Sequence, residues 1–203
     1  MRETKQWLLV LLLLAGTTTA FGQVAEFSFS GGQSLLRNNL LTSVDVGNGE
    51  TADIKLKDGF RFGFRITLNN FRFAGNEFGY AYNRTKLDIG TQPAQELGMA
   101  IHQGFYNFLV YAVPEGGTIR PFVTGGAHFS NFVPPGTSVT SGGGSTKFGL
   151  NYGGGLKVRV ASMFLVRFDV RQYHTPKPDF FVGPAPAGWL RQIEASAGFA
   201  LAL

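Results

Sequence analysis

A strict alternation of apolar and polar side chains marks residues 59–68, GFRFGFRITL. Successive side chains of a β-strand point to opposite sides, so the phenylalanines fall on one face and Arg61 and Arg65 on the other. Arginines are costly in a soluble core, whereas a membrane barrel places one strand face in lipid and the other in a hydrated interior. The segment predicts a membrane-spanning strand, with Phe62 toward lipid and Arg65 toward the lumen.

The same alternation recurs in residues 148–160, 164–171 and 193–203. In the second of these, Phe168 lies between Arg167 and Asp169 and faces the opposite way. With weaker patterns elsewhere, eight strands are predicted: residues 24–34, 52–68, 73–88, 97–113, 118–131, 147–160, 163–174 and 189–203. The expected fold is all-β, an eight-stranded antiparallel up-and-down transmembrane β-barrel.

The predicted connections alternate in length. Short links are expected at Asn69-Asn70, 114–117 and 161–162, and long polar loops at 35–51, 89–96, 132–146 and 175–188. Short periplasmic turns and long outer loops are typical of outer-membrane barrels. An even number of strands also places both chain ends on the periplasmic side.

Two segments depart from a clean alternation. The apolar parity changes between Phe73 and Phe78, and a turn or bulge near Gly75-Asn76 would absorb the slip. Residues 97–113 contain FYNFLVYAV, which is apolar on both faces. The sequence therefore leaves the register of this strand open.

The N-terminus predicts export. Arg2 and Lys5 precede an apolar run at residues 7–15, and small residues follow, so we expect a signal peptide at residues 1–20 with cleavage after Ala20. A transmembrane helix is the alternative, but the run is shorter than the ~20 residues that span a bilayer. Residues 21–203 are then the outer-membrane β-barrel domain.

Composition adds three constraints. The absence of cysteine fits a barrel closed by backbone hydrogen bonds rather than disulfides. The net charge of +5 is spread along the chain, without a basic run that would indicate nucleic-acid binding. Because side chains fill the interior of an eight-stranded barrel, we expect a paired charge network there. Its predicted members are Arg61, Arg65, Glu77, Arg167, Asp169, Arg171 and Glu194.

Four passages carry a family resemblance: EFSFSGGQSLL, EGGTIRPFVTGGAHFSNF, NYGGGLKVRV and FLVRFDVRQY. Over residues 24–203 the chain resembles the small outer-membrane-protein β-barrels, the OmpA/OmpX-like eight-stranded barrels. The resemblance implies a non-enzymatic protein of the cell outer membrane with a structural or surface-interaction role through its outer loops. The implied partners are outer-membrane lipid, lipopolysaccharide and the barrel-assembly machinery, with no nucleic acid and a monomeric state. Leu203 replaces the C-terminal aromatic that is common in such proteins.

One motif suggests an enzymatic alternative. His128-Phe129-Ser130-Asn131 looks like the His-x-Ser-Asn motif of lipid A 3-O-deacylases, in which His128 would be the base, Ser130 the nucleophile and Asn131 an oxyanion donor. However, His128 and Ser130 share the predicted lumenal face of their strand, and the nearest downstream acid is Asp169. We therefore expect no catalytic residues.

The acidic residues and histidines do not fall at metal-ligand spacing, so neither a metal site nor a cofactor is expected. A soluble exported lipocalin-like barrel, with its apolar faces turned inward around a ligand, is the remaining alternative. Alternation alone does not distinguish lipid-facing from core-facing residues, whereas the loop lengths and the charged faces favour the membrane.

Overall fold

The computed structural model describes residues 25–47, 49–91, 93, 95–137, 144–179 and 187–203. The predicted signal peptide and parts of the third and fourth predicted outer loops lie outside the described residues. The described chain forms ten strands in one antiparallel sheet. They are β1 (Ala25–Arg37), β2 (Leu40–Gly47), β3 (Glu50–Leu56), β4 (Gly59–Phe71), β5 (Ala74–Ile89), β6 (Gln95–Tyr111), β7 (Ile119–Val133), β8 (Ser145–Arg159), β9 (Phe164–Pro176) and β10 (Trp189–Ala202).

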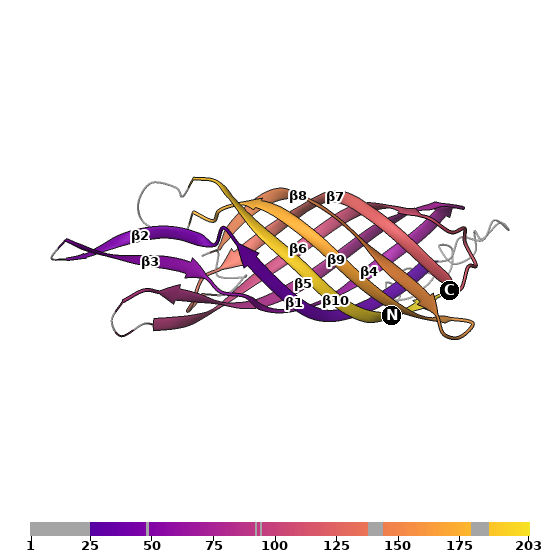
Figure 1. Cartoon of the computed structure of the whole chain (residues 1–203), viewed down its shortest axis with the longest axis horizontal. Coiled ribbons are helices and arrows are strands. Elements are labelled where there is room, and N and C mark those ends of the chain that lie inside the picture. Colours follow the sequence, from indigo (N-terminus) through magenta and orange to yellow (C-terminus); the bar gives the residue numbers. More distant parts are fainter. Residues whose placement is uncertain (1–24, 48, 92, 94, 138–143, 180–186) are drawn as a thin grey trace, which may run out of the picture.

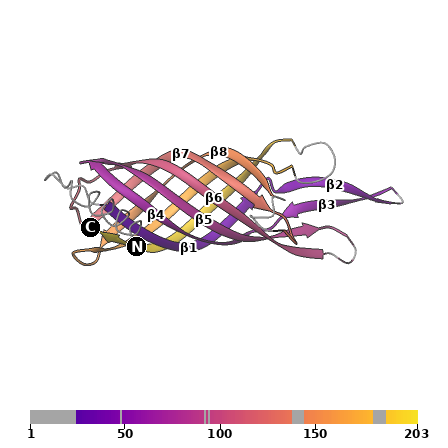
Figure 2. The same ribbon diagram turned by 180° about the vertical axis from the view of Figure 1, so that it is seen from behind.

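Eight of these strands close into a barrel (Figure 1). The order around the barrel is β1, β4, β5, β6, β7, β8, β9 and β10, and β10 pairs with β1 to complete the ring. The amide of Leu203 donates to the carbonyl of Ala25 at 2.9 Å, so the last strand ends beside the first. The predicted eight-stranded antiparallel barrel is confirmed, with both described ends of the chain on one side (Figure 2).

The two remaining strands form a hairpin that projects from the opposite end of the barrel (Figure 1). The prediction of one strand over residues 52–68 was wrong: the chain breaks at Lys57-Asp58 into β3 and β4. Even-numbered residues stay apolar on both sides of the break, but they face the interior before it and the outside after it. Leu56 is fully buried, whereas Phe60 is 51% exposed. Period-2 alternation reports which residues share a face and not which way that face points.

Two predicted outer loops are shorter than expected. The predicted loop at 35–51 contains the end of β1 and the whole of β2. β5 and β6 stay paired as far as Ile89 opposite Gln95, and β3 pairs with the end of β5 through Ile54 and Ile89. The outer extension, defined here as β2, β3 and the ends of β5 and β6, is therefore a sheet rather than a set of loops.

The first inner turn also differs from its prediction. β4 continues through Asn69-Asn70 to Phe71, and the chain turns at Arg72-Phe73. The parity slip does involve a bulge: Leu68 pairs with Asn76 and Phe71 with Ala74, which leaves one extra residue on β4. The bulge lies on β4 and not at Gly75-Asn76. In β6, the strand whose register was left open, odd-numbered residues face the lumen.

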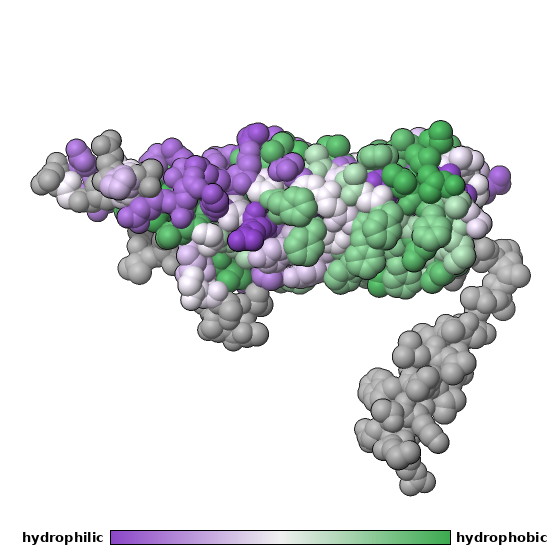
Figure 3. All heavy atoms as spheres, turned by 90° about the horizontal axis from the view of Figure 1, so that it is seen from below, coloured by the Kyte–Doolittle hydropathy of each residue, from purple (hydrophilic) through white to green (hydrophobic). Residues whose placement is uncertain are grey.

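The two faces of the barrel have opposite character. Phe62 and Phe168 are 50% and 48% exposed on the outside, whereas Arg65 and Arg167 are buried inside, as predicted. Apolar surface covers the part of the barrel nearer the chain ends, and polar surface predominates toward the hairpin (Figure 3). A lipocalin-like barrel requires the reverse arrangement, with an apolar interior. No helix of the described chain is long and apolar enough to cross a membrane.

Candidate functional site: the barrel lumen

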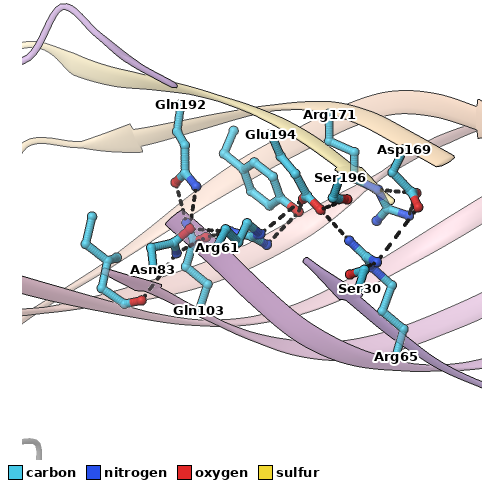
Figure 4. A network of polar contacts seen from close by, with 12 residues as sticks. Ser30, Arg61, Arg65, Asn83, Gln103, Asp169, Arg171, Gln192, Glu194 and Ser196 are labelled. Atoms are coloured by element: carbon cyan, nitrogen blue, oxygen red, sulfur yellow. Dashed lines mark hydrogen bonds and ion pairs between the residues drawn. The ribbon is translucent and has the colours of Figure 1, made fainter. Parts of the chain in front are cut away.

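Glu194 of β10 lies at the centre of a buried polar network (Figure 4). Its carboxylate accepts hydrogen bonds from Arg65 Nη2 at 2.5 Å, Ser196 Oγ at 2.6 Å and the Tyr173 hydroxyl at 2.9 Å. Arg61 Nε lies 3.2 Å from the same carboxylate. Because β4, β9 and β10 all contribute, the network spans the inside of the barrel.

Asp169 of β9 forms the second centre of this network. Arg167 donates to it through two nitrogens, at 2.8 and 3.0 Å, a bidentate geometry that is among the stronger ion-pair arrangements. Arg171 approaches the same carboxylate at 2.8 Å. Glu77 of β5 then pairs with Arg171 at 2.8 Å and with Arg167 at 2.6 Å, which ties β5 to β9 across the lumen.

The predicted lumenal charges therefore all meet in one cluster. Each of these seven side chains is at most 2% exposed. A buried charge is tolerated when it is paired and hydrogen-bonded, and here four arginines surround three carboxylates. The prediction of a paired network that fills the interior is confirmed. We name this set (Arg61, Arg65, Glu77, Arg167, Asp169, Arg171 and Glu194) the central network.

A smaller charged cluster lies toward the end of the barrel that carries the chain termini. Lys157 forms an ion pair with Glu26 and donates to the Tyr111 hydroxyl at 2.9 Å. Arg120 lies over the Tyr111 ring, with 3.7 Å from its guanidinium carbon to the ring centroid, and 3.3 Å from Glu115. Sequence reasoning missed Glu26, although it alternates with Phe27 and Phe29 as Arg61 does with its neighbours.

An amide ring lies on the other side of the central network, toward the hairpin. Gln103 donates to Gln192 at 2.9 Å, Gln192 to Asn83 at 3.1 Å, and Asn83 back to Gln103 at 3.0 Å. Arg61 donates to Asn83 at 3.3 Å and so joins this ring to the central network.

Beyond the amide ring, nine buried apolar side chains close the lumen at the end that carries the hairpin. Their sources are β1, β2, β3, β5, β6, β7 and β10, so the hairpin packs into the mouth of the barrel. The cluster consists of Leu36, Leu41, Ile54, Leu56, Leu87, Met99, Ile101, Phe132 and Leu190. The sequence did not predict this apolar plug because it depends on the reversal at Lys57-Asp58.

The residues of the deacylase-like motif are divided between the two faces of β7. His128 is 3% exposed in the lumen, and its Nε2 lies 2.8 Å from the Thr175 hydroxyl. Ser130 accepts a hydrogen bond from the Gln103 amide at 2.8 Å, and Asn131 on the outside donates to Thr146 at 2.7 Å. A nucleophilic serine needs a base within hydrogen-bond reach. Within the described chain, no hydrogen bond joins His128 to Ser130 or to a carboxylate.

The described residues do not form a metal site. Among the described positions, no group of three or more histidine, cysteine, aspartate or glutamate side chains is arranged to hold a metal ion. The carboxylates of the central network instead face guanidinium groups, which occupy the positions that a cation would take.

Ion pairs also hold the outer extension together. Glu96 at the start of β6 forms ion pairs with Lys57 and with Lys86, the latter at 2.6 Å. The hydrogen bond from Lys57, followed by that from Lys86, lowers the pKa of Glu96 to about 2. Lys147, together with the Ser145 hydroxyl, likewise lowers the pKa of Asp179 to about 2. This end of the barrel therefore presents a paired, charged surface.

Comparison with known proteins places this arrangement in a family. Residues 8–199 match the model for the outer membrane protein beta-barrel domain. No curated protein sequence matches the chain. The structure is similar to that of OprG from Pseudomonas aeruginosa, with a TM-score of 0.58 and 12% identity over 89% of this chain and 97% of that one.

Two further solved structures have a similar fold. AlkL, determined in lipid bilayers, gives a TM-score of 0.59 and 13% identity over 93% of this chain and 94% of that one. Neisserial surface protein A gives a TM-score of 0.55 and 12% identity over 89% of this chain and 97% of that one. These likenesses concern the fold, and the family match covers most of the sequence. The chain therefore belongs to the outer membrane protein β-barrel family and is a protein of the Gram-negative outer membrane.

Proposed function

We propose that this protein is a non-enzymatic, closed barrel with a structural or surface-interaction role. The observation that carries the proposal is the filling of the lumen by successive side-chain layers. The inner charged cluster, the central network, the amide ring and the apolar plug follow one another along the barrel. An open diffusion pore needs a continuous water path, and eight strands leave room for little more than side chains.

The outer extension is the part of the described chain that is suited to contact other molecules. It is a paired sheet rather than a loop, and its exposed side chains include Lys55, Lys86 and Glu96. Rigid, charged elements lose little conformational entropy when a partner binds. We infer that surface interactions take place here, outside the cell.

The surroundings of His128 and Ser130 support a non-enzymatic role. Both side chains are buried in the lumen, where an acyl ester of a membrane lipid does not reach them. Nucleophilic catalysis also requires a general base beside the serine hydroxyl, and Ser130 is bonded instead to the Gln103 amide. The two residues have a structural role in this proposal, in which they join β7 to β6 and β9.

Export and insertion into the outer membrane precede this role. Residues 1–20 are removed as a signal peptide, and residues 21–203 form the mature domain. The barrel is inserted by the barrel-assembly machinery and works as a monomer among outer-membrane lipid and lipopolysaccharide. It uses no metal or cofactor and binds no nucleic acid.

Site-specific labelling tests the proposed orientation, because the chain contains no cysteine. Glu50→Cys places a thiol in the exposed hairpin, and Ser162→Cys places one in the exposed turn at the opposite end. A membrane-impermeant maleimide added to intact cells is expected to label Glu50→Cys and to leave Ser162→Cys unlabelled until the cells are lysed. Labelling of Ser162→Cys alone in intact cells would reverse the orientation and remove the hairpin from the cell surface.

A further inference from the structure

Three basic side chains form a row on the outside of the barrel, near its hairpin end. Arg37 of β1 lies directly opposite Arg191 of β10, and Arg191 lies directly opposite His174 of β9. Arg37 and Arg191 are exposed, and His174 is half-buried. Side chains directly opposite each other on neighbouring strands are within about 5.5 Å at their Cβ atoms. We call these three residues the basic row.

Like charges in directly opposite positions destabilise a sheet unless an anion lies between them. Asp58 pairs with Arg37 at 3.2 Å, whereas Arg191 has no carboxylate within ion-pair distance among the described residues. Arg191 instead contacts the Gln172 amide oxygen at 3.2 Å, in the amide orientation that also accepts from His174 at 2.8 Å. The basic row therefore carries more positive charge than its protein neighbours balance.

The surroundings of the basic row identify it as a membrane-boundary position. The Tyr152 ring stacks on His174 at 5.6 Å between centroids, and Trp189 lies two residues from Arg191 on the same strand face. Tyrosine and tryptophan rings collect at the level of the lipid headgroups. The next outward-facing residues toward the chain ends are Ile193 and Leu35, which are apolar and face each other across the strand pair.

β1 and β10 also border an apolar groove, which lies closer to the chain ends than the basic row does. Phe29, Phe62 and Phe199 border a hollow of about 580 Å³ on the outside of the barrel. Its floor includes Gly31 and Ala197, which lie opposite each other. Each lies six residues from its arginine, about 20 Å along the strand. With a strand tilt of about 40°, this is about 15 Å of depth, one leaflet of a ~30 Å hydrocarbon core.

We propose that β1, β9 and β10 form a binding site for a phosphate-bearing acylated lipid of the outer leaflet. The phosphate lies between Arg37, Arg191 and His174, and one acyl chain follows the two strands down into the groove. Arginine suits a phosphate because its planar donors bind two oxygens at once. The inference rests on the proposed orientation, with the hairpin outside the cell, and assigns a site to the lipopolysaccharide partner.

Trp189 provides the measurement. The chain has two tryptophans, and Trp7 lies in the proposed signal peptide, so in the mature protein Trp189 alone reports the environment of Arg191. The folded protein in detergent micelles is titrated with phosphorylated lipid A, with dephosphorylated lipid A and with inorganic phosphate. We expect a saturable change in Trp189 emission with phosphorylated lipid A, with a midpoint at a lower concentration than for dephosphorylated lipid A or inorganic phosphate. Arg37→Gln with Arg191→Gln is expected to weaken binding about 25-fold, roughly fivefold for each arginine.

Arg84→Gln is the matched control. Arg84 is also exposed on the outside, but it lies opposite Phe60 and Ala100 rather than another basic residue. Arg84→Gln should leave the affinity for phosphorylated lipid A unchanged. If the glutamine pair fails to fold, the Arg37→Lys, Arg191→Lys pair is measured in its place and should keep most of the wild-type affinity. Equal affinity for dephosphorylated lipid A, or an equal loss with Arg84→Gln, would overturn the site. An equally strong response to inorganic phosphate would overturn its assignment to a lipid. The labelling of Glu50→Cys tests the orientation separately.

Discussion

At the residue scale, Glu194 of the central network is bonded by four side chains. Two arginines, a tyrosine and a serine all bond to it within 3.2 Å. Removing one member of a buried ion pair leaves its partners charged and unpaired, which costs about 3–5 kcal/mol. Glu194 therefore links three strands through a single carboxylate.

Glu194→Gln is expected to lower the free energy of unfolding by about 3 kcal/mol. Glu115→Gln is the control, because Glu115 is 21% exposed and its one ion pair within the described chain is with Arg120 at 3.3 Å. It should cost no more than about 1 kcal/mol. Urea unfolding of the protein in lipid vesicles, followed by gel mobility, measures both. Equal stability of the two variants would show that the network does not hold the barrel together.

Phe62 tests the lipid-facing side. Its side chain is 50% exposed on the outside of β4, opposite Gly31. An arginine at the bilayer midplane on the lipid face of a barrel costs about 2–4 kcal/mol. Phe62→Arg is therefore expected to reduce the amount of assembled barrel in the outer membrane, while Phe62→Leu leaves it unchanged. If the arginine variant assembles as well as the leucine variant, this face does not contact lipid.

Substitutions at His128 and Ser130 test whether the protein removes an acyl chain from lipid A. Because Ser130 bonds to Gln103 and His128 to Thr175, neither variant, His128→Ala or Ser130→Ala, should change the acylation of lipid A. Mass spectrometry of lipid A from cells with and without the protein measures this. Loss of a 3-linked acyl chain that depends on Ser130 would contradict the structural role and establish an enzyme.

At the element scale, the alternation of side chains predicts the strands well but not their continuity. The eight barrel strands follow directly from period-2 patterns such as that of residues 59–68. The hairpin does not, because the even-numbered apolar residues continue through Lys57-Asp58 while Leu56 points into the barrel and Phe60 points out. The position of the bulge at Asn69-Asn70 was not predicted for a similar reason. A change of apolar parity shows that the register shifts but not at which residue or on which strand.

The stability of the outer extension should decrease at acid pH, because Glu96 becomes protonated. Its pKa of about 2 in the folded protein lies below the ordinary value of 4.5, so the folded state binds the proton less tightly than the unfolded chain. The stabilisation from Glu96 is therefore fully present above about pH 4.5 and is lost as the pH falls through about 2. Carboxyl NMR should give a midpoint near 2, which Lys57→Gln with Lys86→Gln moves toward 4.5. An unchanged midpoint in that variant would contradict the pairing.

At the scale of the whole molecule, the sequence predicted the contents of the lumen better than its organisation. Arginines and carboxylates on the inner faces had to meet in a closed barrel, and they do. The amide ring and the apolar plug depend on which strands stand opposite each other and on how the hairpin packs, and period-2 patterns contain neither. The basic row was missed because Arg37, Arg191 and His174 come together only through strand register.

Layers of side chains close the barrel from end to end. Single-channel recording of the purified, folded protein in planar lipid bilayers tests this closure most directly, with heat-dependent gel mobility as the check that the barrel is intact. Because the central network, the amide ring and the apolar plug lie in series, we expect no steady conductance at moderate voltage. A stable, ohmic open level in the wild-type protein would contradict this closure and identify a pore.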